Sequence, residues 1–157
     1  ISETEAKLTS TVIGLEVDLR SLPVVEVPRR AMRTVLGNLV DNAIEAMSLG
    51  GGTLSISADA DDRFAYVRVS DTGCGLDEES LTRIFEPFYS TKSPSGSGKL
   101  SRGLGLAVAH GILKVLRGSI IVNSSVGAGT EFEVRLPLRD DAGDTSEVFR
   151  LSPDAIG

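Results

Sequence analysis

Two asparagines, Asn38 and Asn42, lie four residues apart in a stretch whose apolar residues recur every three or four positions. On a helix this spacing puts both carboxamides on the same side, beside the apolar stripe. Asparagine oxygen is a neutral ligand suited to Mg²⁺, which prefers a few protein oxygens together with phosphates and water. The pair is compatible with a magnesium-binding position. Taken alone, it fits two solvated polar residues on a helix flank better.

Asp71 closes a predicted strand and opens the segment Asp71-Thr72-Gly73-Cys74-Gly75-Leu76. Glycines carry no Cβ, so a flat ligand can approach the backbone there. The Asp71 carboxylate can accept a hydrogen bond from an exocyclic amine. An Asp-x-Gly segment is also a frequent tight turn. This segment alone is equally compatible with base binding and with a turn that binds nothing.

A second glycine segment, Gly103-Leu104-Gly105-Leu106, stands between a loop and an apolar helical run. The unpaired N–H groups of a helix N-terminus bind phosphate oxygens. Lys92, Lys99 and Arg102 in the preceding loop can add positive charge. The alternatives are a junction whose glycines permit close packing and a solvated basic loop.

Three further features are expected to be structural. Gly127-Ala128-Gly129-Thr130 fits a hairpin turn. His110, the only histidine, lies in an apolar helical run, so we expect a buried or half-buried imidazole rather than a catalyst. Cys74, the only cysteine, is expected to be a small turn residue, and a single cysteine excludes an internal disulfide and a cysteine-rich zinc site.

Hydrophobic periodicity predicts the elements that position these residues. Alternating apolar and charged residues predict a strand over 15–20 with one wet face. Pro28 suits the first position of a helix whose apolar stripe continues to Met47. The rest of the pattern predicts strands over 53–59, 64–70, 119–123 and 130–136, helices over 77–84 and 103–116, and a long loop over 86–102. This order predicts an α+β fold: a two-layer α/β sandwich with a mixed, largely antiparallel sheet, helices on one face and a flexible lid over 86–102.

Composition narrows the function. The 157 residues, 41% hydrophobic and 24% charged, suit one folded domain. A net charge of −6 argues against a nucleic-acid partner. No apolar run approaches the roughly 18 residues of a membrane helix, so we expect no membrane contact. The start at Ile1 indicates a fragment, in which 1–12 is a connector, 13–138 the domain and 139–157 an acidic tail or linker.

The order of five segments is more informative than any one of them. They are Asn38-Leu39-Val40-Asp41-Asn42-Ala43, Asp71 to Leu76, Ile84-Phe85-Glu86-Pro87-Phe88-Tyr89-Ser90-Thr91-Lys92, Arg102 to Ala107, and Gly127-Ala128-Gly129-Thr130-Glu131-Phe132. Over about residues 13–137 they resemble the successive boxes of the ATP-binding catalytic domain of two-component sensor histidine kinases. Two departures concern the lid: Ser101-Arg102 stands where the family usually has one more glycine, and Ser93 to Leu100 lengthens the loop.

The resemblance implies ATP and Mg²⁺ as ligands. Asn42 would ligate Mg²⁺ with Asn38 assisting, Asp71 would take the adenine amino group, and Gly73 and Gly75 would admit the base. Thr130 would support the adenine through Asp71 and water. Phe85 and Phe88 would anchor the lid, and Lys92 with the amides of Gly103 and Gly105 would receive phosphates. The resemblance also places Leu76, Phe85, Arg102, Leu104 and Leu106 at the nucleotide site, and assigns catalytic roles to Asn38, Asn42 and Lys92.

The resemblance also implies the reaction and its partners. ATPases of the same fold carry a water-activating glutamate four residues before the metal-binding asparagine, where this chain has Asn38. An amide accepts no proton at neutral pH, which favours transfer of the γ-phosphoryl group over hydrolysis. The acceptor histidine would lie on a separate dimerisation domain, for relay to the receiver domain of a response regulator in the cytoplasm. A regulatory nucleotide-binding module and an anti-sigma-type serine kinase remain alternatives.

Overall fold

The computed structural model describes residues 12–19, 27–87 and 105–138. Predictions for the connector over 1–11, for most of the loop over 86–102 and for the tail over 139–157 lie outside these residues. Within the described ranges no helix has the length and apolar character needed to cross a bilayer.

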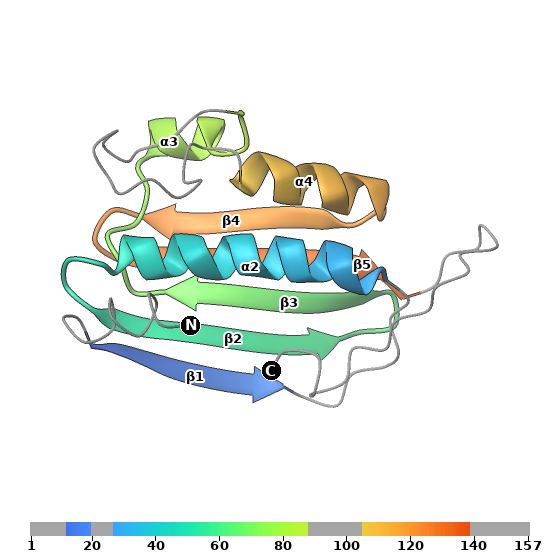
Figure 1. The fold of residues 1–157 in the computed structure, drawn as a ribbon, viewed down its shortest axis with the longest axis horizontal. Helices are drawn as coiled ribbons and strands as arrows, with labels where there is room; N and C mark the ends of the chain where they lie inside the picture. The colour runs from blue at the N-terminus through green and yellow to red at the C-terminus, as the bar shows by residue number, and fades with distance from the viewer. Residues whose placement is uncertain (1–11, 20–26, 88–104, 139–157) are drawn as a thin grey trace.

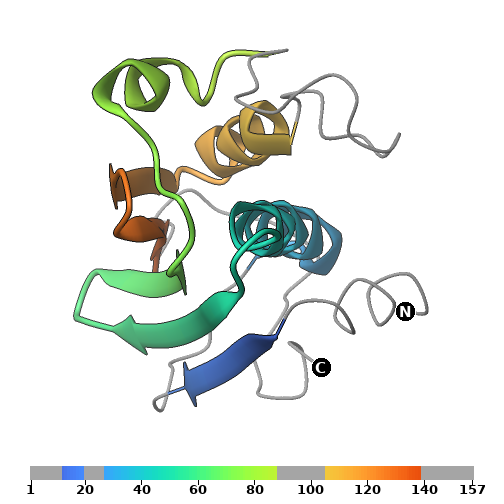
Figure 2. The ribbon, with the colours of Figure 1, turned by 90° about the vertical axis from the view of Figure 1, so that its left-hand side faces the viewer.

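Five strands form one sheet, and two longer helices lie together on one of its faces (Figures 1 and 2). The strands are β1 (Ile13–Leu19), β2 (Gly52–Ala60), β3 (Phe64–Asp71), β4 (Ser119–Ser125) and β5 (Gly129–Pro137). The helices are α2 (Arg29–Ala46), the short α3 (Glu78–Arg83) and α4 (Gly105–Val115). Each predicted helix and strand is present, with ends that differ by a few residues from those expected.

The strand order is β1-β2-β3-β5-β4. β1 pairs in parallel with β2, and the other three pairings are antiparallel. Parallel neighbours require a crossover, and α2 supplies it. The two antiparallel hairpins place β3 and β5 side by side in the middle of the sheet. The predicted α+β sandwich with a mixed, largely antiparallel sheet is therefore confirmed.

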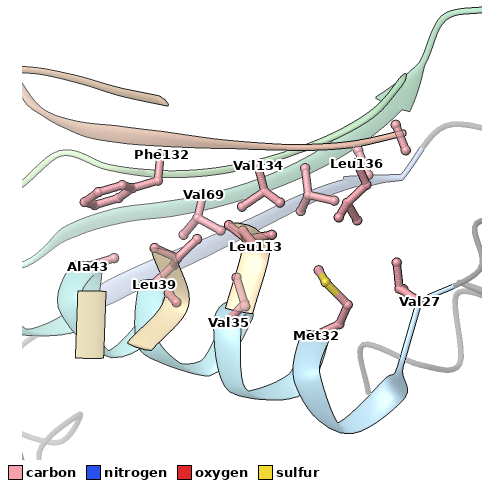
Figure 3. Close-up of a cluster of buried hydrophobic side chains, with 14 of the residues drawn as sticks. Val27, Met32, Val35, Leu39, Ala43, Val69, Leu113, Phe132, Val134 and Leu136 are labelled. Atoms are coloured by element: carbon pink, nitrogen blue, oxygen red, sulfur yellow. The ribbon is translucent and has the colours of Figure 1, made fainter. Parts of the chain in front are cut away.

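The apolar stripe of α2 forms the centre of the core. Met32, Val35, Leu39 and Ala43 are buried at steps of three or four residues, as an amphipathic helix requires. Figure 3 shows them facing Val69, Phe132, Val134 and Leu136 of the sheet, with Leu113 of α4 between. This packing holds α2 against β3 and β5, and α4 packs against α2 and β4. It therefore fixes where α2 ends and where α4 begins relative to the sheet.

β1 differs from the sequence prediction in what covers it. Its register places Leu15 beside Leu54 and Val17 beside Ile56, on the face that carries the helices. Leu15 is nevertheless 65% exposed and Val17 51% exposed. β1 is an edge strand, whereas α2 packs against β2, β3 and β5. Alternation therefore identified the strand correctly, but only the terminal residues of its apolar side, Ile13 and Leu19, are partly buried against the core.

Candidate functional site

Four chain segments end or begin at the same end of the sheet (Figure 1). α2 ends there after Asn42, β3 ends at Asp71, the β4–β5 turn reverses the chain, and α4 begins at Gly105. The topology thus brings the predicted asparagine pair, the first glycine segment and Thr130 to one end of the sheet, although they come from distant parts of the sequence.

Asp71 is buried at this end of the sheet, with 7% of its surface exposed. Its Oδ1 accepts a hydrogen bond of 2.8 Å from the N–H of Gly73. Burial raises the pKa of Asp71 above its ordinary value, while backbone hydrogen bonds from Gly73 and Thr130 partly oppose the rise. None of the described arginines or lysines forms an ion pair with it. A carboxylate buried without a cation is a strong acceptor for a ligand N–H group.

The first glycine segment is held between α2 and the β4–β5 turn. The N–H of Cys74 donates to the Ala46 carbonyl over 3.2 Å, and the Cys74 carbonyl accepts from the N–H of Gly127 over 2.9 Å. A Cβ on Gly73 would stand 2.5 Å from the Ala46 oxygen, and one on Gly75 would overlap the Ser125 carbonyl. Protein backbone, rather than a ligand, therefore excludes side chains here, and a role for these glycines in admitting a base stays a prediction.

Ser124 is a member of this cluster that the sequence analysis missed. Its Oγ accepts from the N–H of Leu76 over 2.8 Å, lies 2.8 Å from Oγ1 of Thr130 and donates to the Gly129 carbonyl over 2.9 Å. A hydroxyl donates once and accepts twice, so this set leaves Thr130 as the donor to Ser124. The hairpin register pairs Ser124 with Thr130. The predicted strand over 119–123 ended one residue before Ser124, so the pairing of Ser124 with Thr130 was not predicted.

Asn38 and Asn42 occupy different environments despite their shared side of α2. Nδ2 of Asn38 donates to the Gly105 carbonyl over 3.1 Å and so ties α2 to the first residue of α4. Nδ2 of Asn42 is buried and has no hydrogen-bond partner within the described residues. Leaving such a donor unpaired costs on the order of 1–3 kcal/mol. The buried Nδ2 of Asn42, near the end of α2, is therefore available to an acceptor atom of a ligand.

The donor set fits a magnesium ion that is held largely by its nucleotide. Across the described residues no group of three or more His, Cys, Asp or Glu could hold a metal. The unpartnered atom of Asn42 is Nδ2, a donor that suits a phosphate oxygen, whereas a magnesium ligand would be Oδ1, so ligation by Asn42 stays a prediction. Mg²⁺ commonly takes one or two protein oxygens and completes its shell with phosphates and water, so this sparse set is compatible with it.

Phe85 and His110 come together beside this cluster. Their rings stack with centroids 5.1 Å apart at an interplanar angle of 27°. Phe85 is partly buried and packs against the core, whereas His110 is exposed. The expectation that His110 is buried or half-buried is therefore wrong, because its helix presents only one flank to the core.

The remaining predicted site residues divide into two groups. Leu76 and Leu106 are partly buried against the core, near the first glycine segment and the start of α4 respectively. Lys92, Lys99, Phe88, Arg102, Gly103 and Leu104 lie outside the described residues. The phosphate-binding half of the predicted site thus stays a prediction from sequence.

Comparisons with known proteins agree on one family. The family described as "Histidine kinase-, DNA gyrase B-, and HSP90-like ATPase" matches residues 28–140. Sensor histidine kinase AtsR of Burkholderia thailandensis is 37% identical over 119 residues, which cover 73% of this chain and 19% of that protein. Sporulation kinase E of Bacillus subtilis is 32% identical over 138 residues, covering 88% of this chain and 18% of that protein.

A solved structure supports the same grouping. The catalytic domain of histidine kinase ThkA superposes with a TM-score of 0.70 at 28% identity, covering 87% of this chain and 88% of that one. The chain therefore spans about a fifth of the length of these curated relatives but nearly the whole of a solved catalytic domain.

Proposed function

Because the chain belongs to the histidine kinase-, DNA gyrase B- and HSP90-like ATPase family, we propose that it is the catalytic domain of a sensor histidine kinase. In this proposal it binds Mg·ATP and passes the γ-phosphoryl group to a histidine on a separate dimerisation domain. The phosphoryl group then goes to the receiver domain of a response regulator in the cytoplasm. The observation that carries the proposal is the convergence of Asp71, Asn42 and the first glycine segment at one end of the sheet.

Asp71 supports adenine recognition. Its buried carboxylate keeps Oδ1 on the N–H of Gly73, and the carboxylate as a whole has more lone pairs than this bond uses. The exocyclic amine of adenine donates hydrogen bonds, whereas guanine presents a carbonyl at the corresponding position. An acceptor fixed in a buried turn therefore discriminates between the two bases.

Asn42 supports binding of the metal-bound phosphates. Its carboxamide stands about one helical turn beyond Asn38, nearer the glycine segment. When bound, Mg²⁺ neutralises charge that develops on the phosphoryl oxygens during transfer. The protein's part is to orient the phosphates toward the incoming histidine and to keep the site rigid, which phosphoryl transfer needs more than covalent chemistry.

Asn38 supports transfer to a protein nucleophile in preference to hydrolysis. Its amide nitrogen already donates to the Gly105 carbonyl. An amide cannot remove a proton from water at neutral pH. This position therefore holds α4 against α2 and provides no general base that would activate water.

The test combines nucleotide binding with phosphoryl transfer. Calorimetry on the 157-residue chain should detect Mg·ADP binding, and labelled ATP should label a supplied histidine-kinase dimerisation domain. Asn42→Ala should weaken magnesium-dependent binding and transfer while leaving the melting temperature unchanged or higher, because it removes an unpaired buried donor. Asn123→Ala, at an exposed asparagine on β4, is the matched control and should behave as wild type.

Three results would overturn all or part of the proposal. No binding of Mg·ADP would reject nucleotide binding altogether. Binding with transfer to a serine of a partner protein, and none to any histidine acceptor, would identify a serine kinase of the same fold. Binding without transfer to either acceptor would identify a regulatory nucleotide-binding module.

A further inference from the structure

We propose that His110 is a positioning residue for the nucleotide site, acting through the ring of Phe85. This inference rests on the proposed function, since it concerns how one predicted nucleotide-binding residue is held. It assigns a role to the only histidine of the chain, which takes no part in the proposed transfer.

The position of His110 on α4 allows this contact. Ala109 and Leu113 are buried, and Leu106 is partly buried against the core. His110 lies next to Ala109 and one turn from Leu106 and Leu113, so it stands at the margin of the buried stripe. From there its ring covers Phe85, with which it makes a stacked contact of 5.1 Å between centroids.

Phe85 also contacts the core. Its neighbour Ile84 is buried. The turn that carries it is closed by a hydrogen bond from the N–H of Glu86 to the Arg83 carbonyl over 2.9 Å. The turn therefore fixes the backbone position of Phe85, and the imidazole of His110 fixes the orientation of its ring.

The stack also joins two parts of the site that the chain keeps apart. Phe85 follows α3, which begins directly after the first glycine segment and is capped at its N-terminus by Asp77, whose Oδ1 accepts from the N–H of Ser80. His110 belongs to α4, whose first residue is held by Asn38. The contact thus makes the position of Phe85 depend on α4, the helix whose first residue is hydrogen-bonded to Asn38.

Substitutions at His110 test this role through affinity. An aromatic pair contributes roughly 0.5–1.5 kcal/mol, so His110→Ala should weaken Mg·ADP binding by about two- to tenfold. His110→Phe keeps a ring that can stack on Phe85, so its dissociation constant should stay within about a factor of two of wild type. Lys114→Ala changes an exposed residue one turn further along the same helix and should leave affinity unchanged.

Melting temperatures measured beside the affinities separate positioning from simple stabilisation. If His110 only stabilised the fold, His110→Ala would melt earlier yet bind Mg·ADP as wild type does when both are fully folded. That result would overturn the positioning role and leave the proposed function intact. Failure of the wild-type chain to bind Mg·ADP would overturn both.

Proton NMR supplies a second readout, because the chain has one histidine and its imidazole signals therefore need no assignment. Mg·ADP should shift the His110 ring signals, because a nucleotide bound against the stacked Phe85 ring changes the environment of the imidazole. In Phe85→Leu this nucleotide-dependent shift should be largely lost. A shift of equal size in Phe85→Leu would show that the coupling does not pass through Phe85 and would overturn the inference.

Discussion

Two buried or half-buried carboxylates show how differently the two faces of this molecule use charge. Asp71, at the site end, is held by backbone N–H groups and no described cation pairs with it. Glu133, on the sheet face away from the helices, accepts from Nε of Arg68 and Nε of Arg135, each over 2.7 Å. The carboxylate of Asp71 is therefore left without a cationic partner, whereas the charge of Glu133 is balanced by two arginines of the protein.

The outer network around Glu133 is satisfied by side chains from three strands. Arg68 also reaches Asp59 over 3.2 Å. The guanidinium carbons of Arg68 and Arg135 lie 5.5 and 5.6 Å from the ring centre of Tyr66. Such cross-strand contacts stabilise a sheet by small increments. The comparison indicates that paired charges on this face serve the fold, while Asp71, which forms no ion pair with a described residue, is the proposed acceptor for a ligand.

The largest effect on nucleotide binding is expected from removing the charge of Asp71. Asp71→Asn keeps an acceptor for the N–H of Gly73 but turns one oxygen into an NH₂ donor that opposes the adenine amine. ATP affinity should fall by about tenfold or more, and the preference for ATP over GTP should shrink. Calorimetry with both nucleotides measures this. Glu133→Gln is the matched control, and an unchanged preference for ATP in Asp71→Asn would remove Asp71 from base recognition.

The next prediction concerns stability and compares two glycines. Gly75 lies among close backbone contacts at the site end, whereas Gly37 lies on the open surface of α2. Gly75 has φ +72°, and a Cβ there would overlap the Ser125 carbonyl. Gly75→Ala should destabilise the fold by at least about 2 kcal/mol, because strain in the left-handed region and the clash add.

Gly37→Ala is the matched substitution, since nothing lies within 4 Å of a Cβ at this position of α2. It should stabilise the fold by roughly 0.5–1 kcal/mol through helix propensity. Urea unfolding of both variants checks the pair. Equal changes in both would contradict the idea that backbone packing dictates the glycines of the site.

The sequence predicted most of the fold because hydrophobic periodicity records local geometry. Met32, Val35 and Leu39 repeat at helical spacing, and buried and partly buried residues alternate along β3 and most of β5. Periodicity does not record which strand ends at an edge, so the exposure of Leu15 and Val17 was missed. Nor does it record coverage of a helix flank by a distant ring, so the exposed stack of His110 on Phe85 was unforeseen.

Site residues were predictable where the chemistry lies in the residue type. Residue type made Asp71, Asn38 and Asn42 candidates, but their roles were assigned through the resemblance of five ordered segments, and the structure brings the three residues to one end of the sheet. Ser124 was missed because its role exists only through pairing with Thr130 across a hairpin. The glycines were identified for base binding, whereas the contacts that require them are with protein backbone.

A smaller effect is expected on the outer face. Glu133→Gln removes the charge that pairs with both guanidinium groups, and the free energy of unfolding should fall by about 0.5–1 kcal/mol at pH 7, since such partly exposed pairs contribute little. Nucleotide affinity should not change. Thermal unfolding with and without added salt measures the loss, which should be smaller in 1 M salt because screening weakens the pair. A loss of binding would mean that the outer network reaches the site.

The smallest effect is a difference in how stability depends on pH at the two carboxylates. Burial raises the pKa of Asp71 above its ordinary value of 3.8, so the folded state favours the protonated form. Its ionisation therefore costs stability as the pH rises from that value through the folded pKa. Burial also raises the pKa of Glu133, but hydrogen bonds from Arg135 and Arg68 outweigh this and hold its pKa below 4.5.

Glu133 consequently stabilises the fold above pH 4.5, and this contribution is lost as the pH falls through its folded pKa. Melting temperatures of the variants and wild type from pH 3 to pH 7 should then change in opposite senses. Relative to wild type, Asp71→Asn should gain stability on going from pH 3 to pH 7, whereas Glu133→Gln should lose it. Parallel profiles for the two variants would mean that both carboxylates are effectively paired in the fold, and that Asp71 holds no charge in reserve for a ligand.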